Sequence, residues 1–181
     1  PRYAVSFGFL FIWRNNMALF RKEKKIDIKN VNPYTLYAPV KGVLKPIELV
    51  DDMVFSSKMM GDGIAIEPID GKIYSPVDGK ISVVFPTGHV VGIESDSGMR
   101  VILHIGIDTV ELNGEGFQSY VHVGDKVHAG SFIMKINLHT ITKNYQATTM
   151  MVIENSEEFH FINKRMGEVE PGMQVLEVER V

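Results

Sequence analysis

The amino-acid sequence predicts an all-β fold, an antiparallel β-sandwich or barrel whose only helices are short turns. From Tyr34 onward, short apolar runs are interrupted by Pro or Gly every several residues, which is typical of strands joined by tight turns. Long stretches with a 3.6-residue apolar period are missing. The chain has 181 residues, of which 45% are hydrophobic, so one domain can bury a sizeable core.

Ten segments have strand-like composition, and two more have room for a short helix. The expected helices lie within residues 52–60, where Asp51 or Asp52 can cap the first turn, and within residues 138–146. The expected strands lie within residues 34–40, 42–50, 63–69, 72–77, 80–86, 89–95, 100–106, 131–137, 149–155 and 173–181.

A repeated six-residue pattern indicates an internally duplicated β unit. The segment Tyr37-Ala-Pro-Val-Lys-Gly42 recurs as Tyr74-Ser-Pro-Val-Asp-Gly79, so that Tyr, Pro, Val and Gly keep the same places. Two copies are too few for a solenoid, which needs at least about three repeats. We therefore expect both copies to lie within one core.

The first 33 residues are expected to lie outside the domain. Phe7–Trp13 is strongly apolar but far shorter than the roughly 20 residues that span a bilayer, and no small-x-small cleavage site follows it. Met17 has the context of a natural start, so residues 1–16 are predicted to be a non-native or disordered extension. Residues 17–33 are predicted to be a flexible N-terminal segment, and residues 34–181 a single domain.

Charge and cysteine content exclude several classes of function. The net charge of −3 disfavours nucleic-acid binding, because phosphate contacts need a basic surface. The chain has no cysteine, which excludes disulfides, thiolate metal sites and a cysteine nucleophile. The absence of cysteine also fits a reducing cytoplasm, where we expect the protein to act.

The six histidines are therefore the candidate nucleophiles or metal ligands. His104 lies in the run Val101–Gly106, which is apolar on both faces of a strand. Strand alternation places Ile102, His104 and Gly106 on one face. A polar ring in such a run needs a hydrogen-bond partner, so His104 on its own fits a structural histidine.

His89 opens the preceding strand, and the turn between the two strands predicts that the two rings meet. Residues 95–98 have turn composition, so residues 89–95 and 99–106 are expected to form a hairpin. A turn centred near residues 96–97 places His89 opposite His104, with Cβ atoms roughly 4.5–5.5 Å apart. A slip of one residue would send one ring to the opposite face.

Two close histidines allow three kinds of chemistry. They can ligate zinc, although a catalytic site usually needs a third protein ligand and a closed site a fourth. They can act as an acid–base pair near neutral pH. They can also form a phosphoryl relay, in which one ring attacks phosphorus and the other donates a hydrogen bond to the phosphoryl oxygens.

Several motifs resemble the glucose-type IIA component of the bacterial phosphoenolpyruvate-dependent sugar phosphotransferase system. They are GDGIAIEP at residues 61–68, SPVDG at 75–79, GH at 88–89, IESDSG at 93–98 and HIGIDTVELNGEGF at 104–117. The resemblance covers about residues 34–155 and extends weakly to residue 181. It implies a compact, mostly antiparallel β-sandwich with the two histidines adjacent in a shallow apolar depression.

The same resemblance implies a phosphocarrier function. His104 would accept a phosphoryl group from the carrier protein HPr and pass it to a cysteine on the IIB domain of a sugar permease, with His89 as the supporting neighbour. The only membrane contact would be through the permease. No cofactor would be required beyond the transient phosphohistidine, and zinc would bind His89 and His104 only with a carboxylate from a partner.

The resemblance also extends to residues around the histidines. Thr87 matches a position that hydrogen-bonds the active-site imidazole, and Asp52 and Asp108 match acidic positions at the rim. A patch for partner binding would comprise Val54, Phe55, Met59, Met60, Phe85 and Ile102. We expect most of Met59 and Met60 to be exposed and most of Phe85 to be buried. His122, His128, His139 and His160 match no functional position and are expected to be structural or on the surface.

Three rival functions can be weighed from the residues. A related type of zinc peptidase would need ligands four residues after His89 and two before His104, but both positions are isoleucine, Ile93 and Ile102. A biotin or lipoyl carrier is suggested by the run at residues 124–130, but Lys135 lies inside a strand-like run rather than at a hairpin tip. A regulatory binding module that uses the same apolar patch without phosphoryl transfer is the remaining alternative.

Overall fold

The computed structural model describes residues 25–181 of the chain. The predictions for residues 1–16, and for the N-terminal segment as far as residue 24, lie outside the described residues. Residues 25–33 have no strand or helix, and the backbone N–H of Ile26 donates to the carbonyl of Gly130 at 2.9 Å. The proposed domain boundaries stay a prediction.

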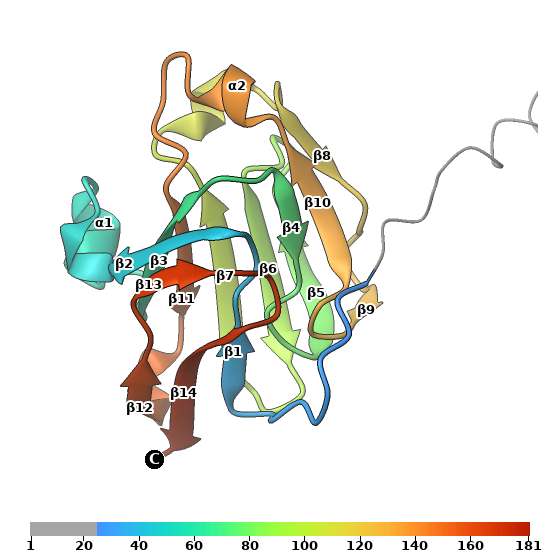
Figure 1. The fold of residues 1–181 in the computed structure, drawn as a ribbon, viewed down its shortest axis with the longest axis vertical. Helices are drawn as coiled ribbons and strands as arrows, with labels where there is room; N and C mark the ends of the chain where they lie inside the picture. Colours follow the sequence, from blue (N-terminus) through green and yellow to red (C-terminus); the bar gives the residue numbers. More distant parts are fainter. Residues whose placement is uncertain (1–24) are drawn as a thin grey trace, which may run out of the picture.

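The described chain consists of three antiparallel sheets, which confirms the predicted all-β fold (Figure 1). The largest sheet runs in the order β13 (Gly167–Val169), β2 (Gly42–Pro46), β3 (Asp62–Pro68), β11 (Thr149–Ile153), β7 (Arg100–Ile105), β6 (Val90–Ser95), β5 (Gly79–Val84) and β9 (Lys126–Val127). One small sheet runs β1 (Thr35–Tyr37), β14 (Gln174–Arg180), β12 (Phe159–Lys164), and the other β4 (Lys72–Tyr74), β10 (Phe132–Ile136), β8 (Phe117–Ser119).

Four of these strands were not predicted, namely β8, β9, β12 and β13. Each lies at the edge of its sheet and pairs on one side only. One-sided pairing leaves part of such a strand exposed, so its sequence can carry a weaker apolar signal than that of a central strand. The edge strands β1 and β4 were nevertheless predicted.

The helical turns are shorter than the sequence suggested. The expected helix within residues 52–60 is α1 (Met53–Ser56), and the one within residues 138–146 is α2 (Leu138–Ile141). Asp52 is the cap of α1, since its carboxylate accepts from the backbone N–H of Val54 at 2.8 Å. Lys58 has a φ of 61°, a left-handed conformation that stops the helix. Single 3₁₀ turns are η2 (Ile47–Leu49), η3 (Thr109–Leu112) and η4 (Ser156–Glu158).

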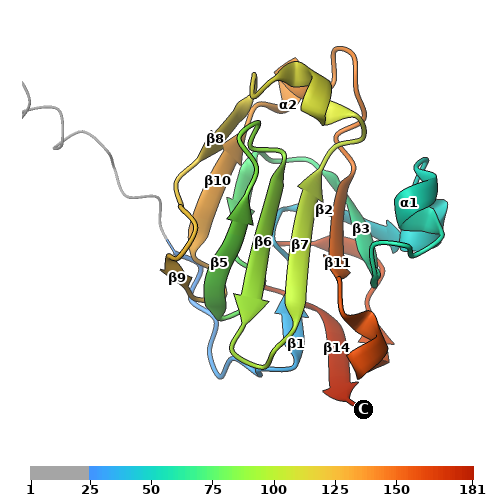
Figure 2. The same cartoon turned by 180° about the vertical axis from the view of Figure 1, so that it is seen from behind.

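Strand β7 separates two apolar clusters on the two faces of the large sheet. Val101, Leu103 and Ile105 point into the main core, which the three sheets share, and the alternate residues Ile102 and His104 lie on the opposite face. A smaller cluster covers that opposite face under α1. It comprises Ile47, Val50, Phe55, Ala65, Ile107, Met150 and Val152, with Ile102 packed against it. Figure 2 shows β5, β6 and β7 side by side, with α1 standing at the far side of β3.

The two copies of the repeated pattern contact each other. The backbone N–H of Tyr37 donates to the carbonyl of Pro76 at 3.0 Å, and that of Tyr74 donates to the carbonyl of Pro39 at 2.7 Å. The glycine that ends each copy also has an equivalent role: a Cβ at Gly42 or at Gly79 would lie 2.2 Å from a carbonyl oxygen of the neighbouring strand. The repeat is therefore a structural duplication within one core.

No helix within residues 25–181 has both the length and the apolar character needed to cross a membrane.

Candidate functional site

The structure brings His89 and His104 into contact. Their ring centroids are 5.1 Å apart and the ring planes are inclined at 84°, an edge-to-face arrangement. His104 lies near the end of β7, and His89 lies in the bend immediately before β6. The prediction that these two rings meet is confirmed.

The strand register that led to this prediction is wrong by one residue. Val90, and not His89, lies opposite His104. The hairpin loop has three residues rather than two, because the N–H of Ser95 donates to the carbonyl of Met99 at 2.9 Å and Gly98 adopts a φ of 88°. The rings still meet because His89 precedes the strand. Gly88, with a φ of 71°, turns the chain there, so His89 does not follow the alternation of β6.

His89 is the more deeply buried of the two rings and is oriented by Thr87. Only 5% of His89 is exposed, and Thr87 Oγ1 lies 2.7 Å from His89 Nδ1. This contact was expected. Burial lowers the pKa of His89, which favours the neutral ring near pH 7. With Nδ1 engaged by the hydroxyl, Nε2 is the free ring nitrogen of His89.

His104 is half-buried and lies beside the ring of Phe55, with centroids 5.0 Å apart. Burial, followed by the charge of His89, lowers the pKa of His104 from 6.5 to about 4. The backbone of Gly106 and the carboxylates of Asp52 and Asp108 act in the opposite direction without compensating. The Nδ1 atom is buried and no group within residues 25–181 meets full hydrogen-bond geometry with it, although the ring is close enough to the backbone of Gly106 for that backbone to favour the protonated form. His104 is therefore an uncharged imidazole at neutral pH.

Apolar side chains lie beside the two rings, as a floor under His104 and as an exposed rim formed by Phe85 and the α1 segment. Phe55, at 4% exposure, and the half-buried Ile102 form the floor beside His104. The rim includes Val54, Met59, Met60 and Phe85, which are 42%, 75%, 37% and 46% exposed. The ring of Phe85 lies 5.6 Å from that of His89. Met59 is mostly exposed and Phe85 slightly more than half buried, as expected, whereas the expectation for Met60 is wrong.

Two further exposed apolar residues were missed by the sequence analysis. Met53, at 77% exposure, follows Asp52, and Val110, at 46%, follows Asp108 by two residues. Their closeness in sequence to Asp52 and Asp108 could have indicated that they belong to the same surface. We call Met53, Val54, Met59, Met60, Phe85 and Val110 the apolar rim.

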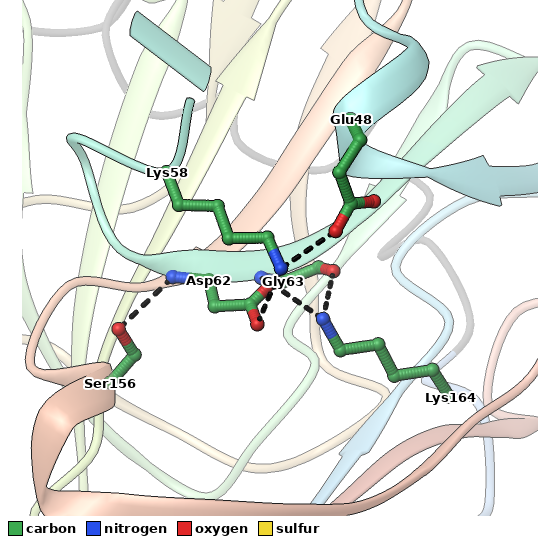
Figure 3. Close-up of polar contacts among 6 residues, drawn as sticks. All are labelled: Glu48, Lys58, Asp62, Gly63, Ser156 and Lys164. Atoms are coloured by element: carbon green, nitrogen blue, oxygen red, sulfur yellow. Dashed lines mark hydrogen bonds and ion pairs between the residues drawn. The ribbon is translucent and has the colours of Figure 1, made fainter. Parts of the chain in front are cut away.

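An ion-pair network anchors the segment that carries α1 (Figure 3). Lys58 Nζ lies 2.6 Å from Glu48 and 3.2 Å from Asp62, and Lys164 Nζ donates to Asp62 at 2.5 Å and to the carbonyl of Gly63 at 3.1 Å. Burial disfavours the charged form of Asp62, but Lys164 and Lys58 outweigh it and lower the pKa of this carboxyl group. The network joins η2, the turn after α1, β3 and β12. No part of it was predicted; the contacts of Lys164 had no local signal, because Lys164 lies 102 residues from Asp62 in sequence.

The remaining candidates occupy the surface. Asp108 is exposed, and Asp52 is half-buried as the cap of α1, so contact of either with a partner stays a prediction. His122, His128, His139 and His160 are all exposed. Within residues 25–181 no group of three or more His, Cys, Asp or Glu side chains is arranged to hold a metal ion.

Comparisons with known proteins agree with this geometry. A family model described as phosphoenolpyruvate-dependent sugar phosphotransferase system, EIIA 1, matches residues 34–159. The chain is 46% identical over 137 residues to a PTS system glucose-specific EIICBA component from Staphylococcus saprophyticus, a match that covers 75% of this chain and 20% of that protein. The chain thus spans about a fifth of the length of this curated relative.

A solved structure is also similar. It is the glucose permease IIA from Mycoplasma capricolum, with 36% identity and a TM-score of 0.76. The match covers 78% of this chain and 93% of that one.

Proposed function

The chain belongs to the EIIA 1 family of the phosphoenolpyruvate-dependent sugar phosphotransferase system, and on that premise we propose that it carries a phosphoryl group on His104. HPr would be the donor, and a cysteine of the IIB domain of a sugar permease the acceptor. The observation that supports this role best is the edge-to-face contact of the two imidazoles, 5.1 Å apart, beside an exposed apolar rim.

The properties of His104 suit a nucleophile. Its lowered pKa keeps the ring neutral at pH 7, so a lone pair is free to attack phosphorus. Because Nδ1 is buried, Nε2 is the atom that would form the new nitrogen–phosphorus bond. The bond from phosphorus to the donor imidazole would break, and the donor ring would leave with the electron pair.

The properties of His89 suit a supporting donor. When the hydroxyl of Thr87 donates to Nδ1, the ring proton lies on Nε2 and can be donated to a phosphoryl oxygen. His89 would thereby stabilise the charge that moves with the phosphoryl group. Thr87 would act through His89 by fixing its tautomer and orientation.

The apolar rim would serve both partners in turn. Methionine side chains repack easily against different surfaces, so Met53, Met59 and Met60 suit a site that must accept two different proteins. Asp52 and Asp108 would meet basic residues of HPr and of the IIB domain. Docking would align the two reacting histidines and exclude water.

We propose further that the carrier acts in the cytoplasm, contacts the membrane only through the permease, and requires no bound cofactor. His89 and His104 supply two metal ligands, fewer than the three protein ligands of catalytic zinc sites. Zinc binding would therefore need a carboxylate from a partner. No comparison supports the alternative of a regulatory module without phosphoryl transfer.

The decisive experiment is reconstitution of the phosphoryl relay. We expect incubation with phosphoenolpyruvate, enzyme I and HPr to produce an acid-labile phosphohistidine signal in phosphorus NMR, and no signal when HPr is omitted. His104→Ala should accept no phosphate. His89→Gln should accept phosphate but pass it to the IIB domain slowly, because the donor to the phosphoryl oxygens is lost.

The exposed His139 offers a matched control, since His139→Gln should behave as the unmodified protein. Phosphorylation of the His104→Ala variant would refute the assignment of the carrier residue. Unimpaired onward transfer by His89→Gln would refute the supporting role of His89.

A further inference from the structure

The apolar rim is unusually rich in exposed sulfur. Met53 and Met59 expose about three quarters of their surface, and Met60 more than a third. Among the other methionines within residues 25–181, only Met166 is similarly exposed, at 43%, and it lies between β12 and β13. Met99, Met134, Met150 and Met151 are completely buried.

The three rim methionines belong to one short segment beside the reactive rings. The segment is α1 with the turn that follows it, and Figure 1 shows it standing at one side of the large sheet. Phe55 of α1 lies against His104, and the N–H of Met59 donates to the carbonyl of Val54 at 3.1 Å. A chemical change at these sulfurs therefore alters the surface around His104 without entering the core.

We propose that Met53 and Met59, with Met60 beside them, form an oxidation site whose modification weakens docking of the phosphoryl carriers. This inference rests on the proposed function. The oxidant is a hydroperoxide: a lone pair of the thioether sulfur attacks the peroxide oxygen, a sulfur–oxygen bond forms, and the oxygen–oxygen bond breaks. Sulfur is oxidised by two electrons, and hydrogen peroxide is reduced to water.

The product changes the character of the rim. A sulfoxide is polar and replaces a flexible apolar thioether, which disrupts interfaces that depend on methionine. The chemistry of the imidazoles is unaffected, because His89 is buried with Thr87 and Nδ1 of His104 faces inward. Oxidation should therefore raise the KM for phosphorylated HPr, roughly tenfold, with a much smaller effect on kcat.

The test treats the full chain with hydrogen peroxide and maps the oxidised residues by peptide mass spectrometry. Single-turnover phosphorylation is then measured over a range of phosphorylated HPr concentrations. We expect Met53 and Met59 to be oxidised well before the four buried methionines, and KM to rise as they react. Methionine sulfoxide reductase should restore the original KM.

Two variants separate the rim from the rest of the chain. In Met53→Leu/Met59→Leu/Met60→Leu, peroxide should leave KM at the value of the untreated variant, since leucine cannot be oxidised. Met166→Leu should lose affinity on oxidation as the unmodified protein does, because its rim methionines are intact.

Full oxidation of Met53 and Met59 with an unchanged KM would overturn the proposal while the phosphocarrier function stands. A KM that rises equally in the triple-leucine variant would overturn it as well, since the effect would then arise elsewhere. Failure of the untreated protein to accept phosphate from HPr would overturn both the proposed function and this inference.

Discussion

His104 combines a neutral ring with a half-buried position, and both follow from its place in β7. The residues on either side point into the main core, and the ring itself packs against Phe55 on the opposite face. Removing water from an imidazole disfavours its charged form, which is the largest contribution to the pKa of about 4. Reactivity at neutral pH is thus a consequence of packing.

This pKa predicts an unusually flat pH profile for phosphoryl uptake. An imidazole with a pKa of 6.5 would lose roughly 90% of its neutral form by pH 5.5, whereas His104 stays neutral to about pH 5. The single-turnover rate of phosphoryl transfer from phosphorylated HPr to His104 should therefore change little between pH 7 and about pH 5. Nitrogen-15 NMR titration should give a midpoint near 4 for His104. A His104 midpoint near 6.5 would contradict this account.

The site residues that could be predicted from the sequence are those whose contacts lie within one short segment. His89, Thr87 and Gly88 are neighbours in one loop, so the hydroxyl–imidazole contact could be anticipated there. The partial shielding of Met60, which leaves 37% of it exposed, and the inward position of Nδ1 of His104 have no such local signal.

At the scale of elements, the segment of α1 is held in place by charge as well as by packing. Phe55 anchors one side in the small apolar cluster, and Asp62 receives two lysines on the other. Single exposed ion pairs contribute little to stability, but Asp62 and Lys164 are about four fifths shielded from solvent. This network therefore controls how firmly the turn after α1 is fixed.

Asp62→Asn tests that role. The substitution removes the charge that attracts Lys164 and Lys58 while keeping an acceptor oxygen, so we expect a loss of about 1–2 kcal/mol in the free energy of unfolding. Amide hydrogen exchange should accelerate severalfold within residues 53–61. Glu154→Gln, which breaks the exposed Arg100 pair, is the control and should leave exchange in that segment unchanged. Equal exchange in both variants would show that packing alone fixes the segment.

Element boundaries were harder to predict than element types. The central strands have continuous apolar runs because both faces are covered, so their positions were visible in the sequence. The hairpin register depended on whether the loop contained two or three residues, which the Ser95–Gly98 sequence alone does not decide. The four missed strands all lie at sheet edges, where one-sided pairing imposes little apolar pattern, although the edge strands β1 and β4 were predicted.

At the scale of the whole molecule, burial of the two histidines makes stability depend on pH. The folded-state pKa of His104 lies below the unfolded value of 6.5, so between pH 6.5 and about 4 the unfolded chain binds a proton that the folded chain does not. The contribution of the neutral His104 to the free energy of unfolding is complete above pH 6.5 and is lost as the pH falls towards 4. His89, whose pKa is also lowered, acts in the same direction.

Urea unfolding across this range checks the linkage. The unmodified protein should lose up to roughly 3 kcal/mol more stability than His104→Gln between pH 6.5 and 4. The variant retains the contribution of His89, so its curve should slope less but in the same sense. Parallel curves for the two proteins would show that His104 is not linked to folding.

The hydrogen bonds between the Tyr37 and Tyr74 corners are reciprocal, as in a contact between identical subunits. Each tyrosine N–H donates to the proline carbonyl of the other copy. A half-length chain with one such corner would satisfy its tyrosine N–H in this way only by associating with another copy of itself. The repeated corner thus gives the present sandwich a local, approximately twofold contact within a single polypeptide.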